Sequence, residues 1–252
     1  MLARKKKPKD ANVDMSVLDH LDELRKRLII IAITVFVATV VCFFFVNDIL
    51  DILIKPAREL ELIYTTPAEA FMSQIRLSFI AGVLLTMPLT LYQVMAFILP
   101  GLRDAEKKVV VPLIISMILL FILGMLFGYL FVFPIILRFF LGFASDKLTP
   151  YFTISAYISF TVSFLVGFGG AFQLPIVFWF LGFFGLLSSN FLKKNRKYAI
   201  LVIFILAAIL TPPDVFSQVL MAIPLLVLYE IGLILVLFTE RRRTKLAKAE
   251  NI

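Results

Sequence analysis

A short charged segment stands directly in front of the first long apolar run. Ser16–Leu28 carries acidic residues first and basic residues last, namely Asp19, Asp22, Glu23, Arg25, Lys26 and Arg27. This order suits the dipole of a helix, and Glu23 can pair with Arg27 because residues four apart are neighbours on a helix. The Glu23 carboxylate would then lie at the boundary between water and membrane, where it could bind a cation.

The same segment has the pattern of an amphipathic helix. Ser16 and Asp19 form a capping box, and four leucines recur at helical spacing as one apolar stripe: Leu18, Leu21, Leu24 and Leu28. These features predict a helix that lies on the membrane surface and leads into a spanning helix.

The chain lacks the residues that common enzyme and metal sites need. It has one histidine, His20, and one cysteine, Cys42, which lies inside an apolar run. The sequence contains no HExxH, P-loop or Gly-rich nucleotide motif, and no Ser/His/Asp set on the apolar runs. We therefore expect no enzyme activity, no cofactor and no metal centre.

Polar residues inside apolar runs are the usual functional candidates in membrane proteins. Gln173 is one, and it could act in function or bond a neighbouring helix and the carbonyls freed by Pro175. Glu230 is another, either buried against other helices or reaching water. A third group, Thr211, Asp214, Ser217 and Gln218, favours a turn with Asp214 or Ser217 as helix N-cap.

The composition indicates a multi-pass membrane protein. The 252 residues are 61% apolar, with a mean hydropathy of +1.00, and the apolar runs are too long for strands. We predict an all-α fold with six spans, at about 28–47, 77–99, 109–137, 154–188, 198–210 and 216–238. They form one domain, 16–238, between a disordered basic tail, 1–15, and a basic cytoplasmic tail, 239–252.

Several details of the spans follow from Pro and Gly. Pro67 marks a helix start, Gly124 and Gly128 form a close-packing motif, and the long fourth span is tilted or kinked at Pro175. The fifth run, 198–210, rises only about 20 Å, less than the hydrocarbon core of a bilayer.

The distribution of Lys and Arg predicts the topology. The segments before 28, at 100–108, at 190–197 and after 238 hold 8, 3, 4 and 5 of them, against 5 elsewhere. Six spans with both termini in the cytoplasm satisfy the positive-inside rule, which also explains the net charge of +8 without nucleic acid. A re-entrant hairpin of the last two runs would leave the charged sides unchanged.

Three stretches together resemble the TatC family, the polytopic core of the twin-arginine protein translocase. They are His20-Leu-x-Glu23-Leu-Arg-x-Arg-Leu28, then Pro88-x-x-x-Tyr92-Gln93-x-x-Ala96-Phe97-x-x-Pro100-x-Leu102-x-x-x-Glu106, and finally Leu210-Thr-Pro-Pro-Asp-Val-Phe-Ser-Gln218 with Ala222-Ile-Pro224 and Tyr229-Glu230-Ile231-Gly232. The resemblance covers about 18–238.

The resemblance implies a glove-shaped six-helix receptor in a bacterial-type cytoplasmic membrane. Such a receptor binds twin-arginine signal peptides of folded cargo, assembles with single-span TatA/TatB-type partners, could self-associate, and runs on the proton-motive force. Glu23 and Glu106 match the signal-binding carboxylates, and Thr211 and Gln218 match partner-docking positions. Gln173 stands where the family often has Glu, which weakens any role for a titrating carboxylate there.

Two other classes of protein compete with a signal receptor. A secondary transporter of small solutes predicts inverted repeats and several polar residues at the midplane, and no convincing repeat relates 28–137 to 154–238. A passive assembly scaffold is the third class, and it would not bind the signal peptide.

Overall fold

The computed structural model describes residues 17–57, 62–98, 104–143, 151–211 and 213–250, and most of them are helical. The elements are α1 (Val17–Phe44), α2 (Val46–Ile54), the 3₁₀ turn η1 (Lys55–Ala57), β1 (Leu62–Ile63), α3 (Pro67–Ile98), α4 (Asp104–Phe127), the π-helical segment η3 (Gly128–Val132), α5 (Phe133–Leu141), β2 (Phe152–Thr153), α6 (Ile154–Ala171), α7 (Leu174–Phe183), α8 (Ser189–Lys194), α9 (Arg196–Leu210) and α10 (Val215–Glu250).

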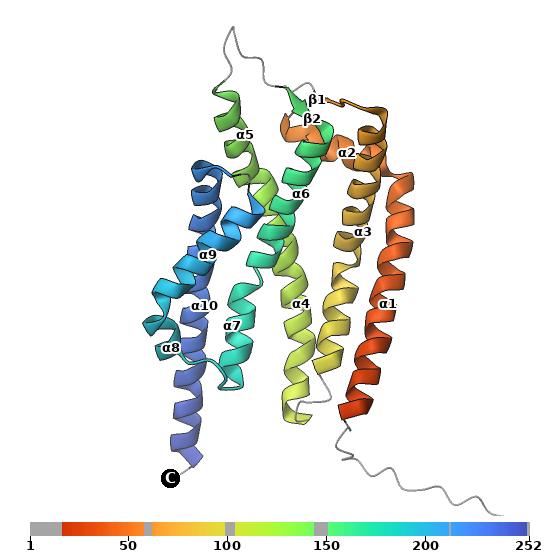
Figure 1. Cartoon of the computed structure of the whole chain (residues 1–252). Helices are drawn as coiled ribbons and strands as arrows, with labels where there is room; N and C mark the ends of the chain where they lie inside the picture. Colours follow the sequence, from red (N-terminus) through yellow and green to blue (C-terminus); the bar gives the residue numbers. More distant parts are fainter. Residues whose placement is uncertain (1–16, 58–61, 99–103, 144–150, 212, 251–252) are drawn as a thin grey trace, which may run out of the picture.

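The long helices run alternately up and down, so the start of α1 and the end of α10 lie at the same end of the bundle (Figure 1). The junctions between α3 and α4 and between α7 and α8 also lie toward that end, which is the lower end in the figure. At the opposite end, β1 and β2 pair in parallel, with Leu62 opposite Phe152.

The core of the bundle lies around α6, which packs against α3, α4 and α9. Phe133, Phe164 and Phe168 are fully buried there and contact one another through their rings. α1 instead lies at one edge and packs mainly on α3 (Figure 1). Much of its remaining surface is apolar and exposed, as Phe36 shows with 70% exposure, and this suits contact with lipid.

The glycine motif of α4 brings its backbone close to α6, as predicted. A Cβ atom on Gly124 would lie 2.6 Å from the carbonyl oxygen of Phe168, and one on Gly128 would lie 3.1 Å from the Phe168 ring. Only glycine allows helices to approach this closely.

Two prolines coincide with irregular helix. Pro134 is the second residue of α5, just after η3. The wider π-helical turn accommodates the missing N–H and the ring clash of proline while the apolar helix Val111–Leu141 continues. Pro175 lies at the start of α7, just after the break between α6 and α7 at Phe172 and Gln173, where the sequence predicts a kink.

The helix ends depart from the predicted spans in two places. α7 ends at Phe183 rather than near 188, because Gly185 adopts a φ of +75° that stops the helix. α10 continues to Glu250 through the predicted tail 239–252, whose Lys, Arg, Glu and Ala residues favour helix.

The start of α1 also differs from the prediction. The segment before Leu28 continues without a break into α1 and is no separate surface helix. Two leucines of its predicted apolar stripe, Leu21 and Leu28, are each 55% exposed, while Leu24 is partly buried. Ser16 lies outside the described residues, so its capping role stays a prediction.

Five helical stretches in the described part of the chain are long and apolar enough to cross a membrane: His20–Phe44, Pro67–Phe97, Val111–Leu141, Ile154–Phe183 and Val215–Arg243. α9 has 15 residues and rises only about 22 Å. The predicted sixth span is therefore short, and the count of six stays a prediction.

Replacing Gly124 by Ala should destabilise the bundle by about 1–3 kcal/mol, because the new methyl group overlaps the Phe168 carbonyl. Gly170→Ala is the matched control, since a Cβ there meets nothing within 4 Å and both changes gain the same helix propensity. The measurement is the thermal unfolding midpoint of each purified variant in detergent. Equal midpoints for the two variants would show that the α4–α6 contact is loosely packed.

Candidate functional site

The predicted carboxylate site lies where the first turns of α1 meet the last turns of α3. His20, Glu23 and Arg27 follow one another at spacings of three and four and therefore share one face of α1. All three are partly buried, whereas their neighbours Asp22 and Lys26 are exposed. The face of this segment that carries these three polar side chains thus points toward the rest of the protein.

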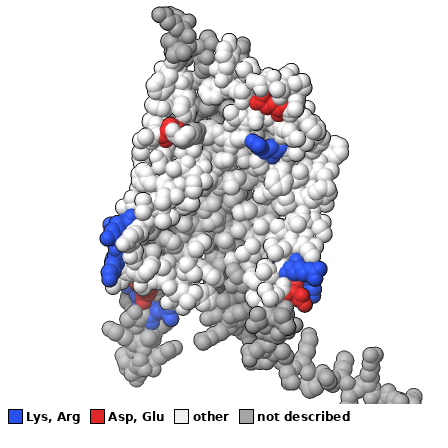
Figure 2. Space-filling view, viewed as in Figure 1, with Lys and Arg blue, Asp and Glu red and all other residues white. Residues whose placement is uncertain are grey.

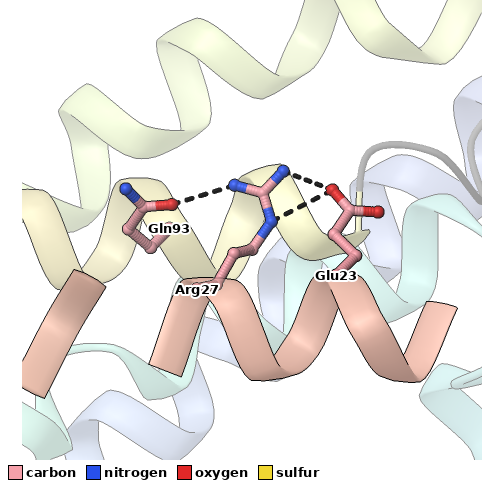
Figure 3. Close-up of polar contacts among 3 residues, drawn as sticks. All are labelled: Glu23, Arg27 and Gln93. Atoms are coloured by element: carbon pink, nitrogen blue, oxygen red, sulfur yellow. Dashed lines mark hydrogen bonds and ion pairs between the residues drawn. The ribbon is translucent and has the colours of Figure 1, made fainter. Parts of the chain in front are cut away.

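Arg27 joins Glu23 to Gln93 of α3 (Figure 3). Its Nε and Nη2 both donate to Oε1 of Glu23, Nε at 3.1 Å, and its Nη1 donates to Oε1 of Gln93 at 2.9 Å. The predicted pairing of Glu23 with Arg27 is confirmed. The side chains of Glu23 and Arg27 are only 19% and 21% exposed, so water weakens their attraction less than at an open surface.

The second oxygen of Glu23 has no hydrogen-bond partner among the residues that the structure describes. Oε2 is buried and accepts no hydrogen bond, although an ionised carboxylate can accept about four. A buried acceptor without a partner costs free energy. Beside it, the His20 ring stacks on Phe97 with centroids 4.2 Å apart, which ties α1 to α3 on the other side of Glu23.

Glu106 lies at the same end of the bundle. α4 begins at Asp104 rather than near 109, so Glu106 belongs to its first turn. Its side chain lies outside what the structure describes. The α3–α4 junction and the start of α1 are at one end (Figure 1), so the structure brings the backbones of both predicted carboxylates to that end.

Gln173 ties the break between α6 and α7 to α4. Its Nε2 donates to the carbonyl oxygens of Met117, at 3.0 Å, and Gly169, at 3.4 Å. The bond to Met117 of α4 is the contact with a neighbouring helix that the structural alternative predicts. Its Oε1 is buried and has no partner.

Glu230 pairs with Arg196, the first residue of α9. The Arg196 Nη2 donates to Glu230 Oε2 at 2.8 Å, and the two side chains are 50% and 44% exposed. Glu230 therefore reaches a polar surface, and a pair this exposed contributes little to stability.

Thr211 and Gln218 both donate hydrogen bonds to backbone carbonyls of α9. Thr211 is buried and donates its hydroxyl to the Ala207 carbonyl at 2.8 Å, and Gln218 Nε2 donates to the Phe204 carbonyl at 3.0 Å. Asp214 accepts from the backbone N–H of Ser217 at 2.7 Å and so caps α10, as one of the two predicted N-caps. Gln218 thus joins α10 to α9, whereas the bonds of Thr211 and Asp214 stay within the end of α9 and the start of α10.

The sequence argument missed the role of Gln93. It was noted only within a motif, yet it is a lone buried amide in a long apolar run, which is a usable signal. Within the described residues, no group of three or more His, Cys, Asp or Glu side chains could hold a metal ion.

Comparisons with known proteins agree in their result. A family model described as Sec-independent protein translocase protein (TatC) matches residues 19–224. Two relatives named Sec-independent protein translocase protein TatC are similar over most of the chain. The one from Carboxydothermus hydrogenoformans is 43% identical over 227 residues, 89% of this chain and 93% of the relative. The one from Aquifex aeolicus is 41% identical over 241 residues, 93% of this chain and 100% of the relative.

The fold is similar to a crystal structure described as that of the twin-arginine translocase receptor TatC. The TM-score is 0.80 at 41% sequence identity, and the match covers 88% of this chain and 99% of that chain. A second crystal structure of the same receptor, in the detergent DDM, gives a TM-score of 0.79 at 42% identity and covers 86% and 98% of the two chains.

Proposed function

The chain belongs to the TatC family of Sec-independent protein translocase proteins, and from that premise we propose that it is the receptor that binds twin-arginine signal peptides of folded proteins for export. It is an all-α membrane protein and a translocase component, not an enzyme. A transporter of small solutes has no support among its relatives.

This proposal rests on the carboxylate of Glu23, of which only one oxygen is hydrogen-bonded. One oxygen already holds the guanidinium of Arg27, and the other is unpaired. Carboxylates bind guanidinium groups through short, charge-assisted hydrogen bonds. A signal-peptide arginine can therefore satisfy Oε2 while Arg27 keeps Oε1.

Gln93 supports this arrangement as a positioning residue. By accepting from Nη1 of Arg27, it holds that guanidinium on one side of Glu23. Arg27 then offsets the charge of the carboxylate while no peptide is bound, which reduces the cost of keeping it shielded from water.

Glu106 supplies a second carboxylate in the proposed site. A pair of arginines calls for two acceptors, and the first turn of α4 lies at the same end of the bundle as Glu23 (Figure 1). A carboxylate in the first turn of a helix is also favoured by the helix dipole. Lysine would replace arginine poorly, because it lacks the planar fork of donors.

The protein has the character of a multi-pass inner-membrane protein, and we place both termini in the cytoplasm. The end of the bundle where α1 begins and α10 ends carries most of the described Lys and Arg residues (Figure 2), which the positive-inside rule assigns to the cytoplasmic side.

Single-span partners of the TatA/TatB type would dock on α9 in this proposal. One face of α9 is exposed and apolar, with Leu201, Ile205 and Ile209 at 58%, 50% and 73% exposure, while Ile203 and Ala207 are buried. In this arrangement Gln218 holds α9 against α10, Thr211 closes the end of α9, and the exposed stripe makes the contact.

Topology is tested by labelling single cysteines from outside the membrane. Cysteines at Glu61 and Lys147 should react with an impermeant maleimide on intact cells, whereas those at Lys107, Lys194 and Lys248 should react only after lysis. The native cysteine is buried, so background labelling should be low. Labelling of position 194 from outside would contradict the six-span arrangement.

Peptide binding is tested with Glu106→Gln in the purified full chain. Affinity for a twin-arginine peptide should fall about tenfold or more, because hydrogen bonds to charged groups contribute roughly 1.5–3 kcal/mol. Glu23→Gln should have an effect of similar size. Replacing the peptide's arginines by lysines should then cost much less in Glu106→Gln than in wild type, which a double-mutant cycle measures.

Asp104→Asn is the matched control for that experiment, because Asp104 lies in the same first turn of α4. It should leave affinity within about threefold of wild type, and membrane insertion and abundance should be normal in every variant. Additive effects of Glu106→Gln and the peptide change would contradict the assignment of Glu106.

Partner docking is tested by crosslinking cysteines placed on α9. Cysteines at Leu201 and Ile209 should crosslink to a single-span partner, and one at Phe36 of α1 should not, although it is 70% exposed. Cysteine at the buried Thr211 should crosslink weakly. Equal crosslinking at Phe36 would mean that the partner contacts lipid-facing surface without preference for α9.

A further inference from the structure

A cleft between α7 and α10 opens at the same end of the bundle as Glu23 but on another pair of helices. Its volume is about 460 Å³, and its apolar lining includes Trp179, Phe183, Leu235 and Phe238. A second cavity of about 260 Å³ shares Trp179 and Leu235 with it and reaches α4 at Pro112. The two cavities therefore adjoin at Trp179 and Leu235, between α7 and α10.

Two arginines stand at one end of this cleft. Arg242 and Arg243 line the larger cavity together with Thr239, and both arginines are exposed. The α10 residues of the lining recur at spacings of three and four, so they share one helix face. The guanidinium of Arg243 lies against Gly185 at the end of α7, which places this charge at the mouth of the cleft.

The arginines stand at the end of the apolar stretch Val215–Arg243 of α10, so we place them at the level of the lipid headgroups. Arg242 follows Val215, the first residue of α10, by 27 positions, which is about 40 Å of helix. A bilayer with its headgroup regions is roughly 40–45 Å thick. Trp179 also has the interfacial preference typical of tryptophan in membrane proteins.

We propose that this cleft binds one anionic phospholipid. An acyl chain would pack along Trp179 and Leu235, and the headgroup phosphate would bind Arg242 and Arg243. Arginine suits phosphate because its fork of donors matches the phosphate oxygens, and basic pockets between helices on the cytoplasmic side are suited to anionic headgroups.

The charge at the mouth favours this occupant over a signal peptide. A peptide that carries two arginines would bring cations against Arg242 and Arg243, and like charges placed together are unfavourable. The second cavity is lined by uncharged residues, which favours a ligand with an apolar chain over free phosphate.

Trp179 makes the proposal testable, because it is the only tryptophan in the chain and lines both cavities. The full chain is placed in nanodiscs of phosphatidylcholine that contain increasing fractions of brominated phosphatidylglycerol or brominated phosphatidylcholine. Bromine quenches tryptophan on contact. Half-maximal quenching should need roughly 30-fold less of the anionic lipid, since each basic residue near the headgroups contributes about fivefold.

The double variant Arg242→Gln/Arg243→Gln should lose this preference, and high salt should weaken it in the wild-type protein. Arg241→Gln is the matched control, because Arg241 is exposed on the same helix but does not line the cleft. It should quench like wild type. The emission maximum in unbrominated lipid checks that each variant keeps the Trp179 environment.

Three outcomes would overturn the proposal. Equal quenching by both lipids in the wild-type protein would mean that Trp179 meets only bulk lipid. Quenching by a twin-arginine peptide with a brominated apolar segment, together with displacement of the brominated phospholipid, would make the cleft a peptide groove. Loss of the anionic preference in Arg241→Gln as well would show that general surface charge, and not this site, attracts the lipid.

Discussion

A hydrogen-bonding group between apolar helices must find its partner inside the protein, because lipid tails offer none. This constraint accounts for most of the polar side chains that interrupt the apolar runs. Gln173 donates to two carbonyl oxygens at the break between α6 and α7, and Gln218 donates to a carbonyl of α9. The buried hydroxyl of Tyr157 donates to Leu53 at 2.8 Å and ties α2 to the core. These residues hold the irregular parts of the bundle together.

Glu23 differs from these residues because it carries a charge, which its surroundings must stabilise. Among the described residues, two carboxylates have a buried oxygen with no hydrogen-bond partner, those of Glu23 and Asp214. Asp214 caps α10, so the helix dipole stabilises its charge. The charge of Glu23 depends on one guanidinium, that of Arg27. Buried polar groups that remain unsatisfied are uncommon in native proteins, so a carboxylate arranged in this way is a reasonable place for a ligand cation.

Local patterns predicted much of the fold, and contacts between distant residues account for what they missed. The helix start at Pro67, the Gly124–Gly128 motif and the break before Pro175 can each be read from a short stretch of sequence, and the structure has a helix start, a close approach and a break at these places. The direction of the polar face of α1 depends on α3, so the sequence could not reveal that Gln93 turns it inward. The pairing of Glu230 with Arg196 spans 34 residues, so it could not be predicted from local sequence either.

The arrangement of charges raises a question about how a cationic signal could bind at all. Lys and Arg outnumber Asp and Glu among the described charged residues at the end of the bundle proposed to receive it (Figure 2). The whole chain has a net charge of +8. Exposed charges act over a Debye length of about 8 Å at physiological salt, whereas shielded pairs are screened much less. Repulsion from the exposed bases of α8, α9 and α10 is therefore weak at the distance of α1, at the far edge of the bundle (Figure 1). Attraction to the shielded Glu23 acts at contact and persists. The same physics keeps an anionic lipid near Arg242 and Arg243, so one end of the protein can hold ligands of opposite charge on separate helices.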